Sequence, residues 1–347
     1  MINVIDKLIK DKILSKDEFV SLLQCNDIEV NKYLQECAVN IRKNIYKNHV
    51  YIRGLIEISN ICKNDCLYCG IRKSNKNCSR YRLKKEDILA CCYSGYKLGF
   101  RTFVLQGGED GYYNDDILSD IIKSIKINHP DCAITLSLGE RTKESYQKLF
   151  NAGADRYLLR HETANYEHYS KLHPAELTLK NRLDCLAKLK EIGFQTGCGF
   201  MVGSPFQTLE NIAEDLIFIA EFKPQMVGIG PFIPHNDTPF KNEKAGSVDL
   251  TCKILSIIRL ILPNVLLPAT TALGSLETDG REKGILHGAN VVMPNLSPED
   301  VRDKYMLYNN KLSSGVEAAE SLNLLKESMQ KIGYEIVVSR GDFKPNN

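Results

Sequence analysis

The chain has 347 residues, of which 43% are apolar and 25% charged, and its net charge is +2. This composition is typical of a soluble globular protein, and the near-neutral charge argues against a partner that is nucleic acid or a membrane surface. The sequence begins without the apolar core of a signal peptide, and no stretch reaches the roughly 18 apolar residues of a membrane span, so we expect a cytoplasmic protein.

Residues 1–48 have apolar side chains at helical spacing, with Ser15 and Asp17 as candidate helix caps. Strand-like and helical segments alternate after them, and several of the helical segments end in glycine, as helices often do. The glycines are Gly99, Gly153 and Gly193. The strand-like runs cover residues 51–59, 101–107, 133–139, 156–162, 195–203, 225–234, 265–272 and 289–295.

This alternation predicts an α/β fold with parallel strands, and eight strand-like runs fit a (β/α)8 TIM-type barrel. A doubly wound sheet is the alternative, but no G-x-G-x-x-G motif follows a strand. We expect an N-terminal helical extension over residues 1–48 and the barrel over 49–300. A C-terminal segment, 301–347, would close the barrel and carry a helix near 316–332.

One group of cysteines forms a motif directly after the first strand-like run. Cys62, Cys66 and Cys69 have the spacing C-x3-C-x2-C. Three thiolates can hold three irons of a [4Fe–4S] cluster and leave the fourth iron open to a substrate or cofactor. A zinc site with a distant fourth ligand is the alternative, although zinc sites usually combine C-x2-C pairs or histidines. We expect the cysteines in apolar runs to be buried core residues: Cys91, Cys92, Cys132, Cys185 and Cys252.

A cysteine motif of this spacing on a βα barrel resembles the radical S-adenosylmethionine (SAM) superfamily. The resemblance implies that SAM binds the open iron and that one electron from the cluster cleaves it to methionine and a 5′-deoxyadenosyl radical. It also implies that Tyr68 lies near the adenine of SAM. Gly107 and Gly108, in the segment "LQGGED", would receive the amino group of SAM through their backbone.

Longer segments resemble the [FeFe]-hydrogenase maturase family HydE, a relative of biotin synthase and methylornithine synthase. They are "CLYCGIRKSNKN", "RYLLRHETAN", "MVGIGPFIPH", "LPATTALG" and "GANVVMPN". This resemblance implies that Glu162 and Arg182 hold the ribose and carboxylate of SAM, with Ser137 and Arg160 nearby. It implies a small organometallic substrate inside the barrel, an iron–cysteine complex with CO and cyanide supplied by the maturase HydG. From it the dithiomethylamine bridge of the hydrogenase H-cluster would be assembled. The candidate substrate residues are Gln106, Thr135, Arg156, Met226, Thr270, Thr271, Tyr305 and Tyr308.

We expect one [4Fe–4S] cluster per chain, because Ser313, Ser321 and Leu324 stand where some HydE chains have a second set of cysteines. The basic stretch 71–82 is interpreted as a solvated surface, with docking of an acidic electron donor, such as ferredoxin or flavodoxin, as the alternative. Two other functions stay open. One is a methylornithine-synthase-like mutase acting on an amino acid, and the other is a non-catalytic iron–sulfur carrier, which would need no SAM pocket.

Overall fold

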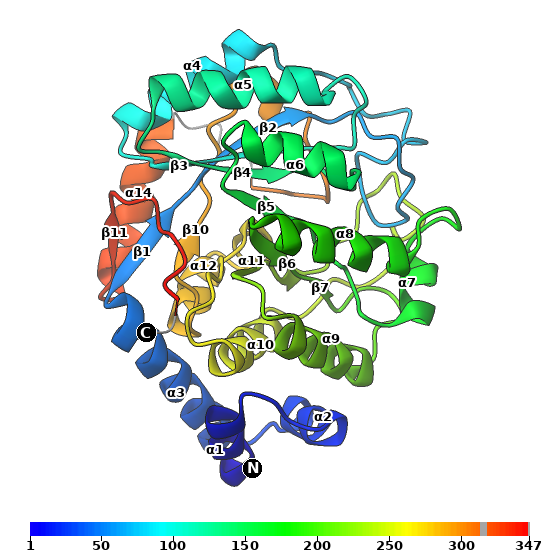
Figure 1. Ribbon diagram of the computed structural model, residues 1–347. Coiled ribbons are helices and arrows are strands. Elements are labelled where there is room, and N and C mark those ends of the chain that lie inside the picture. The colour runs from blue at the N-terminus through cyan, green and yellow to red at the C-terminus, as the bar shows by residue number, and fades with distance from the viewer. Residues whose placement is uncertain (313–317, 346–347) are drawn as a thin grey trace.

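The computed structural model describes residues 1–312 and 318–345. Three helices come first, α1 (Ile2–Asp11), α2 (Lys16–Gln24) and α3 (Ile28–Tyr46). Ser15 begins α2 with a capping box, in which Glu18 donates its N–H to the Ser15 side chain and accepts from the Ser15 N–H. α2 packs against α9 (Leu209–Phe222) and α3 against α10 (Val248–Ile261), so the predicted helical extension lies against the outside of the barrel (Figure 1).

A closed wall of eight parallel segments forms the barrel. Single bridges extend its six main strands from Met226 to Leu266, from Pro268 to Val291, and from Asn295 back to Leu55. Each predicted strand-like run contributes one segment, which confirms the (β/α)8 fold. The strands are β2 (Gly54–Ser59), β3 (Thr102–Gly107), β4 (Ala133–Ser137), β5 (Arg156–Leu158), β6 (Gln195–Cys198), β8 (Met226–Val227) and β10 (Val291–Val292).

Two short pairings add to this wall. β1 (His49–Ile52) lies parallel between β10 and β11 (Glu335–Val337). β7 (Met201–Val202) pairs with β9 (Gly230–Pro231). Because β11 follows the C-terminal helix α14 (Ala318–Lys331), the end of the chain joins its first strand, as the left side of Figure 1 shows.

The longer helices cover the outside of the barrel (Figure 1). Gly193 ends α8 with a positive φ of 105°, and Gly99 and Gly153 follow α4 and α6 with φ of 95° and 113°, as the sequence predicts. Besides α9 and α10, the long helices are α4 (Lys85–Lys97), α5 (Asp115–Asn128), α6 (Lys143–Asn151) and α8 (Leu179–Ile192). Shorter helices lie in the connections: α7 (Tyr166–Leu172), α11 (Thr271–Leu276), α12 (Gly280–Leu286) and α13 (Glu299–Arg302).

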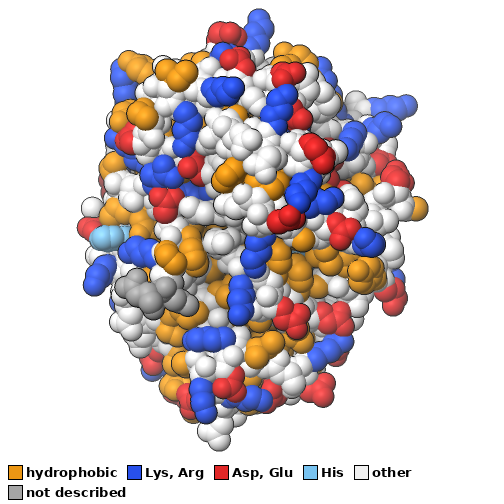
Figure 2. Space-filling view, viewed as in Figure 1, with side chains coloured by type: hydrophobic (Ala, Val, Ile, Leu, Met, Phe, Trp, Pro, Cys, Tyr) orange, Lys and Arg blue, Asp and Glu red, His pale blue; other side chains and the backbone are white. Residues whose placement is uncertain are grey.

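Side chains alternate along the strands between the helix layer and the barrel interior. On β3 and β4, Phe103, Leu105 and Ile134 are buried in the core against the helices, which leaves Gln106 and Thr135 facing inward. The five cysteines predicted to be core residues are buried. No helix in the described ranges is long and apolar enough to cross a membrane. Figure 2 shows positive and negative side chains interspersed over the visible face.

Candidate active site

The cysteine loop follows β2, at the end of the barrel where the parallel strands finish. Three other parts of the chain hold it through backbone hydrogen bonds. Lys63 N–H donates to Glu109 O at 3.0 Å, Leu67 N–H to Leu172 O at 3.0 Å, and Gly70 N–H to Leu307 O at 2.9 Å. The loop is therefore fixed to the segment after β3, to α7 and to the C-terminal part of the chain.

Arg80 holds together the backbone on both sides of the cysteine motif. Its guanidinium donates to four backbone carbonyl groups, those of Asn60 (2.5 Å), Ile71 (2.8 Å), Arg72 (2.6 Å) and Asn75 (3.1 Å). Our interpretation of residues 71–82 as a solvated surface is therefore wrong for Arg72 and Arg80, whereas Arg82 is exposed. Arg72 forms a two-point pair with Asp65 at 2.8 and 2.6 Å, and Arg82 does the same with Asp110 at 2.7 and 2.9 Å. Lys73 and Lys76 are exposed, as expected.

The three cysteine thiols influence one another. Burial raises the pKa of Cys66, and the charge of Cys69 raises it further; burial likewise raises the pKa of Cys62, and that of Cys69 to about 12. Cys62 Sγ accepts a hydrogen bond from Glu109 N–H at 3.4 Å. Three partly buried thiols that repel one another as thiolates suit an iron cluster, whose positive charge stabilises the deprotonated form. No three His, Cys, Asp or Glu residues within 1–312 and 318–345, the three cysteines included, are already arranged around a single metal ion.

The glycine segment after β3 approaches the cysteine loop closely. A Cβ on Gly108 would lie 2.3 Å from Ile61 O, and one on Gly107 would lie 3.3 Å from Ser59 O. Gly108 N–H donates to Ser59 O at 3.0 Å. Gly108 therefore lies beside Ile61 and Cys62, where a larger residue would not fit, whereas Gly107 packs against Ser59, Ile58 and Leu138.

A polar group lies on the neighbouring strand ends. Arg160 and Glu162 form an ion pair at 3.0 Å, and Glu162 has a positive φ of 66° while its N–H donates to Gly199 O. The ion pair joins Arg160 Nη2 to Glu162 Oε2, and the buried Arg160 Nε has no hydrogen-bond partner among the described residues. The charges of Glu162 and Arg182 both act on the pKa of Cys66, so this group adjoins the cysteines. A buried ion pair with a spare donor beside the cluster loop fits a polar, zwitterionic cofactor such as SAM.

Arg182 is buried, not an exposed cation on its helix. Its Nε donates to Glu140 Oε1 at 2.5 Å and its Nη1 to Arg160 O at 2.7 Å. Glu140 also accepts from Asn181 Nδ2 at 2.5 Å. Glu140 was not singled out from the sequence, although it closely follows Ser137, the last residue of β4 and one of the predicted cofactor residues.

Tyr68 belongs to an aromatic group with two other side chains. Its hydroxyl lies 3.2 Å from His173 Nε2, and its ring meets the His173 ring edge-on. His173 stacks on Tyr169 at 3.9 Å and directs Nδ1 to Tyr169 O. Nδ1–H must donate to that carbonyl, so Nε2 accepts from Tyr68. The Tyr169 hydroxyl is buried without a partner.

Several predicted substrate residues face the barrel interior. Within the described part of the chain, the buried hydroxyl groups of Thr135 and Thr270 have no partner, and Gln106 Nε2 lies 3.4 Å from the hydroxyl of Tyr305. Met226 Sδ accepts from Arg53 Nη1 at 3.0 Å, whereas Arg53 Nε and Nη2 have no partner among these residues. Arg53 was not predicted as a site residue, because it stands inside a strand-like run where nothing in the spacing distinguishes it.

The other substrate candidates differ in position. Thr271 lines a cavity of about 160 Å³ with Asn295 and Lys311, and Ser321 lines it too. Tyr308 interacts with Ser275, and burial raises its pKa to about 12. Leu324 is exposed on α14, and Ser313 lies outside the described residues.

Arg156 is the candidate that the structure does not bring to the cysteine loop. It is the first residue of β5, so its neighbours lie at the opposite end of the barrel. Its fully buried guanidinium pairs with Asp342 at 2.5 Å and donates to Thr102 Oγ1 at 3.0 Å and Gln195 Oε1 at 3.1 Å. The C-terminal residues around Asp342 thus occupy this end of the barrel.

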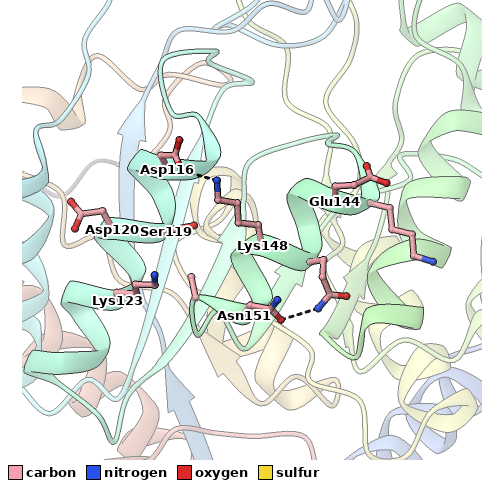
Figure 3. A pocket seen from close by; sticks show the side chains of 10 residues that line it. Asp116, Ser119, Asp120, Lys123, Glu144, Lys148 and Asn151 are labelled. Carbon is pink, nitrogen blue, oxygen red and sulfur yellow. Dashed lines mark hydrogen bonds and ion pairs between the residues drawn. The ribbon is translucent and has the colours of Figure 1, made fainter.

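A groove of about 730 Å³ is remote from this chemistry. It lies on the outer surface between α5 and α6 and is lined by both acidic and basic side chains (Figure 3). Asp116 and Lys148 form an ion pair across it. Because acidic and basic side chains both line this groove, its charge favours neither an anion nor a cation. The candidate site is instead at the end of the barrel that carries the cysteine loop.

Comparison with known proteins agrees with this geometry. Residues 56–219 match the family model of the radical SAM superfamily. The chain is 46% identical over 309 residues to the [FeFe] hydrogenase maturase subunit HydE of Thermotoga maritima, covering 89% of this chain and 88% of that protein. It is 30% identical to a 3-methylornithine synthase of Methanosarcina acetivorans, covering 83% and 81%.

Solved structures share the fold. Methylornithine synthase (PylB) superposes with a TM-score of 0.83 at 25% identity, over 96% of this chain and 97% of that one. The hydrogenase maturase HydG superposes with a TM-score of 0.78 at 21% identity, over 96% and 75%. The cysteine loop, the glycines beside it and the extent of these likenesses lead to one conclusion: the chain is a radical SAM enzyme, with a [4Fe–4S] cluster and SAM as cofactors, and belongs to the [FeFe]-hydrogenase maturase HydE family.

Proposed function

We propose that this enzyme performs a radical step in [FeFe]-hydrogenase maturation, on an iron–cysteine complex that becomes part of the dithiomethylamine bridge. One observation supports this substrate class above all. The 46% identity to HydE extends over 89% of this chain. Inside the barrel, the buried hydroxyls of Thr135 and Thr270 have no partner among the described residues and are available to a polar ligand. Arg53, whose Nε and Nη2 have none either, lies beside Met226 and near Arg156 and Asp342, toward the end of the barrel away from the cysteine loop.

The proposed site has two regions, one for the cluster and SAM and one for the second substrate. Cys62, Cys66 and Cys69 would hold three irons, and the cluster with SAM supplies the 5′-deoxyadenosyl radical. Glu162, paired with Arg160, would orient SAM through its carboxylate, since a carboxylate accepts from ribose hydroxyls. Ser137, Gly107, Gly108, Arg182 and Tyr68 would form the rest of that pocket, with Arg182 fixing Glu140 and the backbone of Arg160.

Further inside, the barrel would bind the second substrate. Gln106, Tyr305, Thr135, Thr270 and Met226 would contact it, with Thr271 and Tyr308 nearer the mouth. The closed wall would exclude water from the reacting atoms.

We also propose the partners. HydG would deliver the iron–cysteine complex, and an acidic electron donor such as ferredoxin or flavodoxin would dock near the cysteine loop. The exposed cations Lys63, Lys73 and Lys76 support this, because opposite charges guide electron-transfer proteins to each other. Such partners would place the enzyme in the cytoplasm.

A second candidate function is a mutase acting on an amino acid. The similarity to 3-methylornithine synthase favours it, since it extends over most of both chains.

One experiment decides between these functions. The anaerobically reconstituted protein is reduced with dithionite in the presence of SAM and either the iron–cysteine complex or a panel of amino acids, and products are identified by mass spectrometry. We expect 5′-deoxyadenosine together with a modified iron–cysteine complex. A rearranged amino acid would establish the mutase, and absence of 5′-deoxyadenosine would contradict both.

A further inference from the structure

Residues 304–312, called here the mouth segment, cross the end of the barrel that carries the cysteine loop. Asn60 Nδ2 donates to Lys304 O at 2.6 Å, and Gly70 N–H donates to Leu307 O at 2.9 Å. Farther along, Asn309 N–H donates to Pro234 O at 3.0 Å. The mouth segment therefore connects the cysteine loop with the loop that follows β9.

The mouth segment is fixed near its end by a buried ion pair. Lys311 is only 8% exposed, and its ammonium group pairs with the carboxylate of Glu57, which is fully buried on β2. The other oxygen of Glu57 accepts from Asn295 Nδ2 at 3.0 Å. A buried ion pair needs such additional hydrogen bonds to offset its desolvation, and a single remaining partner would be strongly unfavourable.

Lys311 also holds Tyr305 directly. Its Nζ donates to Tyr305 O at 2.8 Å and lies 4.8 Å from the centroid of the Tyr305 ring. Tyr305 is 2% exposed, and its hydroxyl lies 3.4 Å from Gln106, the residue that pairs with Glu57 across β2 and β3. Backbone and ring of Tyr305 are thus held by the same ammonium group.

We propose that Lys311 and Glu57 are positioning residues, whose buried ion pair holds Tyr305 over the barrel mouth and thereby sets where the second substrate lies relative to the cysteine loop. The substrate part rests on the proposed function. The holding of Tyr305 does not, so the two can be tested separately.

The first test measures hydrogen exchange of the full chain, loaded with cluster and SAM. We expect Lys311→Met and Glu57→Gln to speed exchange of the mouth segment at least tenfold, most clearly at the Asn309 amide. The double variant should exchange as fast as the worse single variant, because the two residues act through one interaction. It also leaves no unpaired buried charge, so it tests the proposal if a single variant fails to fold. Lys326→Met, which changes an exposed lysine on α14, should exchange like the wild type.

The second test measures coupling, that is, how much 5′-deoxyadenosine is formed for each molecule of the second substrate consumed. Lys311→Met should form 5′-deoxyadenosine without a second substrate at the wild-type rate, and hold the same iron. With the iron–cysteine complex present, it should form at least fivefold more 5′-deoxyadenosine per complex consumed, and Lys311→Arg should restore part of the coupling.

The outcomes separate the two claims. Wild-type exchange in both single variants and in the double variant would overturn the holding of Tyr305. Faster exchange with unchanged coupling would overturn the positioning of the substrate. If the wild-type enzyme forms 5′-deoxyadenosine but leaves the iron–cysteine complex unchanged, the proposed function is wrong, and the exchange result still decides whether the ion pair holds Tyr305.

Discussion

Gly108 leaves the space that Cys62 needs: a Cβ at position 108 would lie 2.8 Å from the Cβ of Cys62. The neighbouring Ile61 carbonyl would be nearer still, and it belongs to the backbone, so it could move only with the whole loop. The segment after β3 therefore determines how far the first cysteine projects into the site.

Gly108→Ala should displace the cysteine loop and weaken cluster binding. Forcing a methyl group into this contact should cost about 1–3 kcal/mol, as overpacking usually does. Iron content after reconstitution and the visible absorption of the cluster measure the effect. Gly111→Ala is the matched control, since no atom lies within 4 Å of a Cβ there. Equal iron content in the two variants would contradict the argument.

Arg80→Gln should make the cluster labile. Four carbonyl groups lose a charged donor, and each such hydrogen bond contributes about 1.5–3 kcal/mol. We expect a chelator to remove iron from the variant at least ten times faster than from the wild type. Lys76→Gln, in the same basic stretch but exposed, should keep the wild-type rate. If both variants lose iron alike, Arg80 does not fasten the loop.

Glu162→Gln and Arg182→Ala should weaken SAM binding while the cluster still assembles. Losing one charge-assisted hydrogen bond should cost about 1.5–3 kcal/mol, which is roughly tenfold or more in the Kd of SAM. Equilibrium binding of SAM to the reconstituted variants measures this loss. Unchanged affinity in both would mean that SAM binds elsewhere.

The chain should hold a single cluster of about four irons, bound by Cys62, Cys66 and Cys69. Replacing each of these residues by Ser should abolish formation of 5′-deoxyadenosine, and the triple variant should bind almost no iron. Cys78→Ser is the control, because Cys78 lies close to the loop, where its Sγ accepts from Asn60 Nδ2 at 3.4 Å and donates to Lys304 O at 4.0 Å. Twice the iron in the wild type, or an intact cluster in the triple variant, would reveal other ligands.

His173, the buried histidine beside Tyr68, should make the protein less stable as the pH is lowered. Burial lowers the pKa of His173 to about 3, against about 6.5 in an unfolded chain. Below pH 6.5 the unfolded state binds a proton at this histidine that the folded state does not bind. The contribution of His173 to the free energy of unfolding is therefore complete above that pH and declines by up to about 1.4 kcal/mol per pH unit below it. Denaturant unfolding of the cluster-free chain at pH 7, 6 and 5 should show a shallower decline for His173→Asn. His49→Asn, at a partly exposed position, should follow the wild type.

The sequence revealed those features that repeat or stand close together. The eight strand-like runs and the triad Cys62, Cys66 and Cys69 could be predicted because their spacing is local. Lys311 and Glu57 could not be paired from the sequence, since 254 positions separate them and neither belongs to a motif. Arg156 was predicted as a residue that contacts the substrate inside the barrel. It is the first residue of β5, so the direction of the parallel strand places it at the end of the barrel opposite the cysteine loop.

The pairing of β1 between β10 and β11 constrains the order of events during synthesis. A ribosome makes residues 49–52 early, yet their second neighbour, residues 335–337, emerges only after almost all of the chain has been translated. Arg156 likewise has no ion-pair partner until Asp342 has been synthesised. The nascent protein thus presents three thiols on an unfinished barrel for most of its translation. Iron delivered too soon would meet a loop without its later supports, so assembly of the cluster belongs after translation of these last segments.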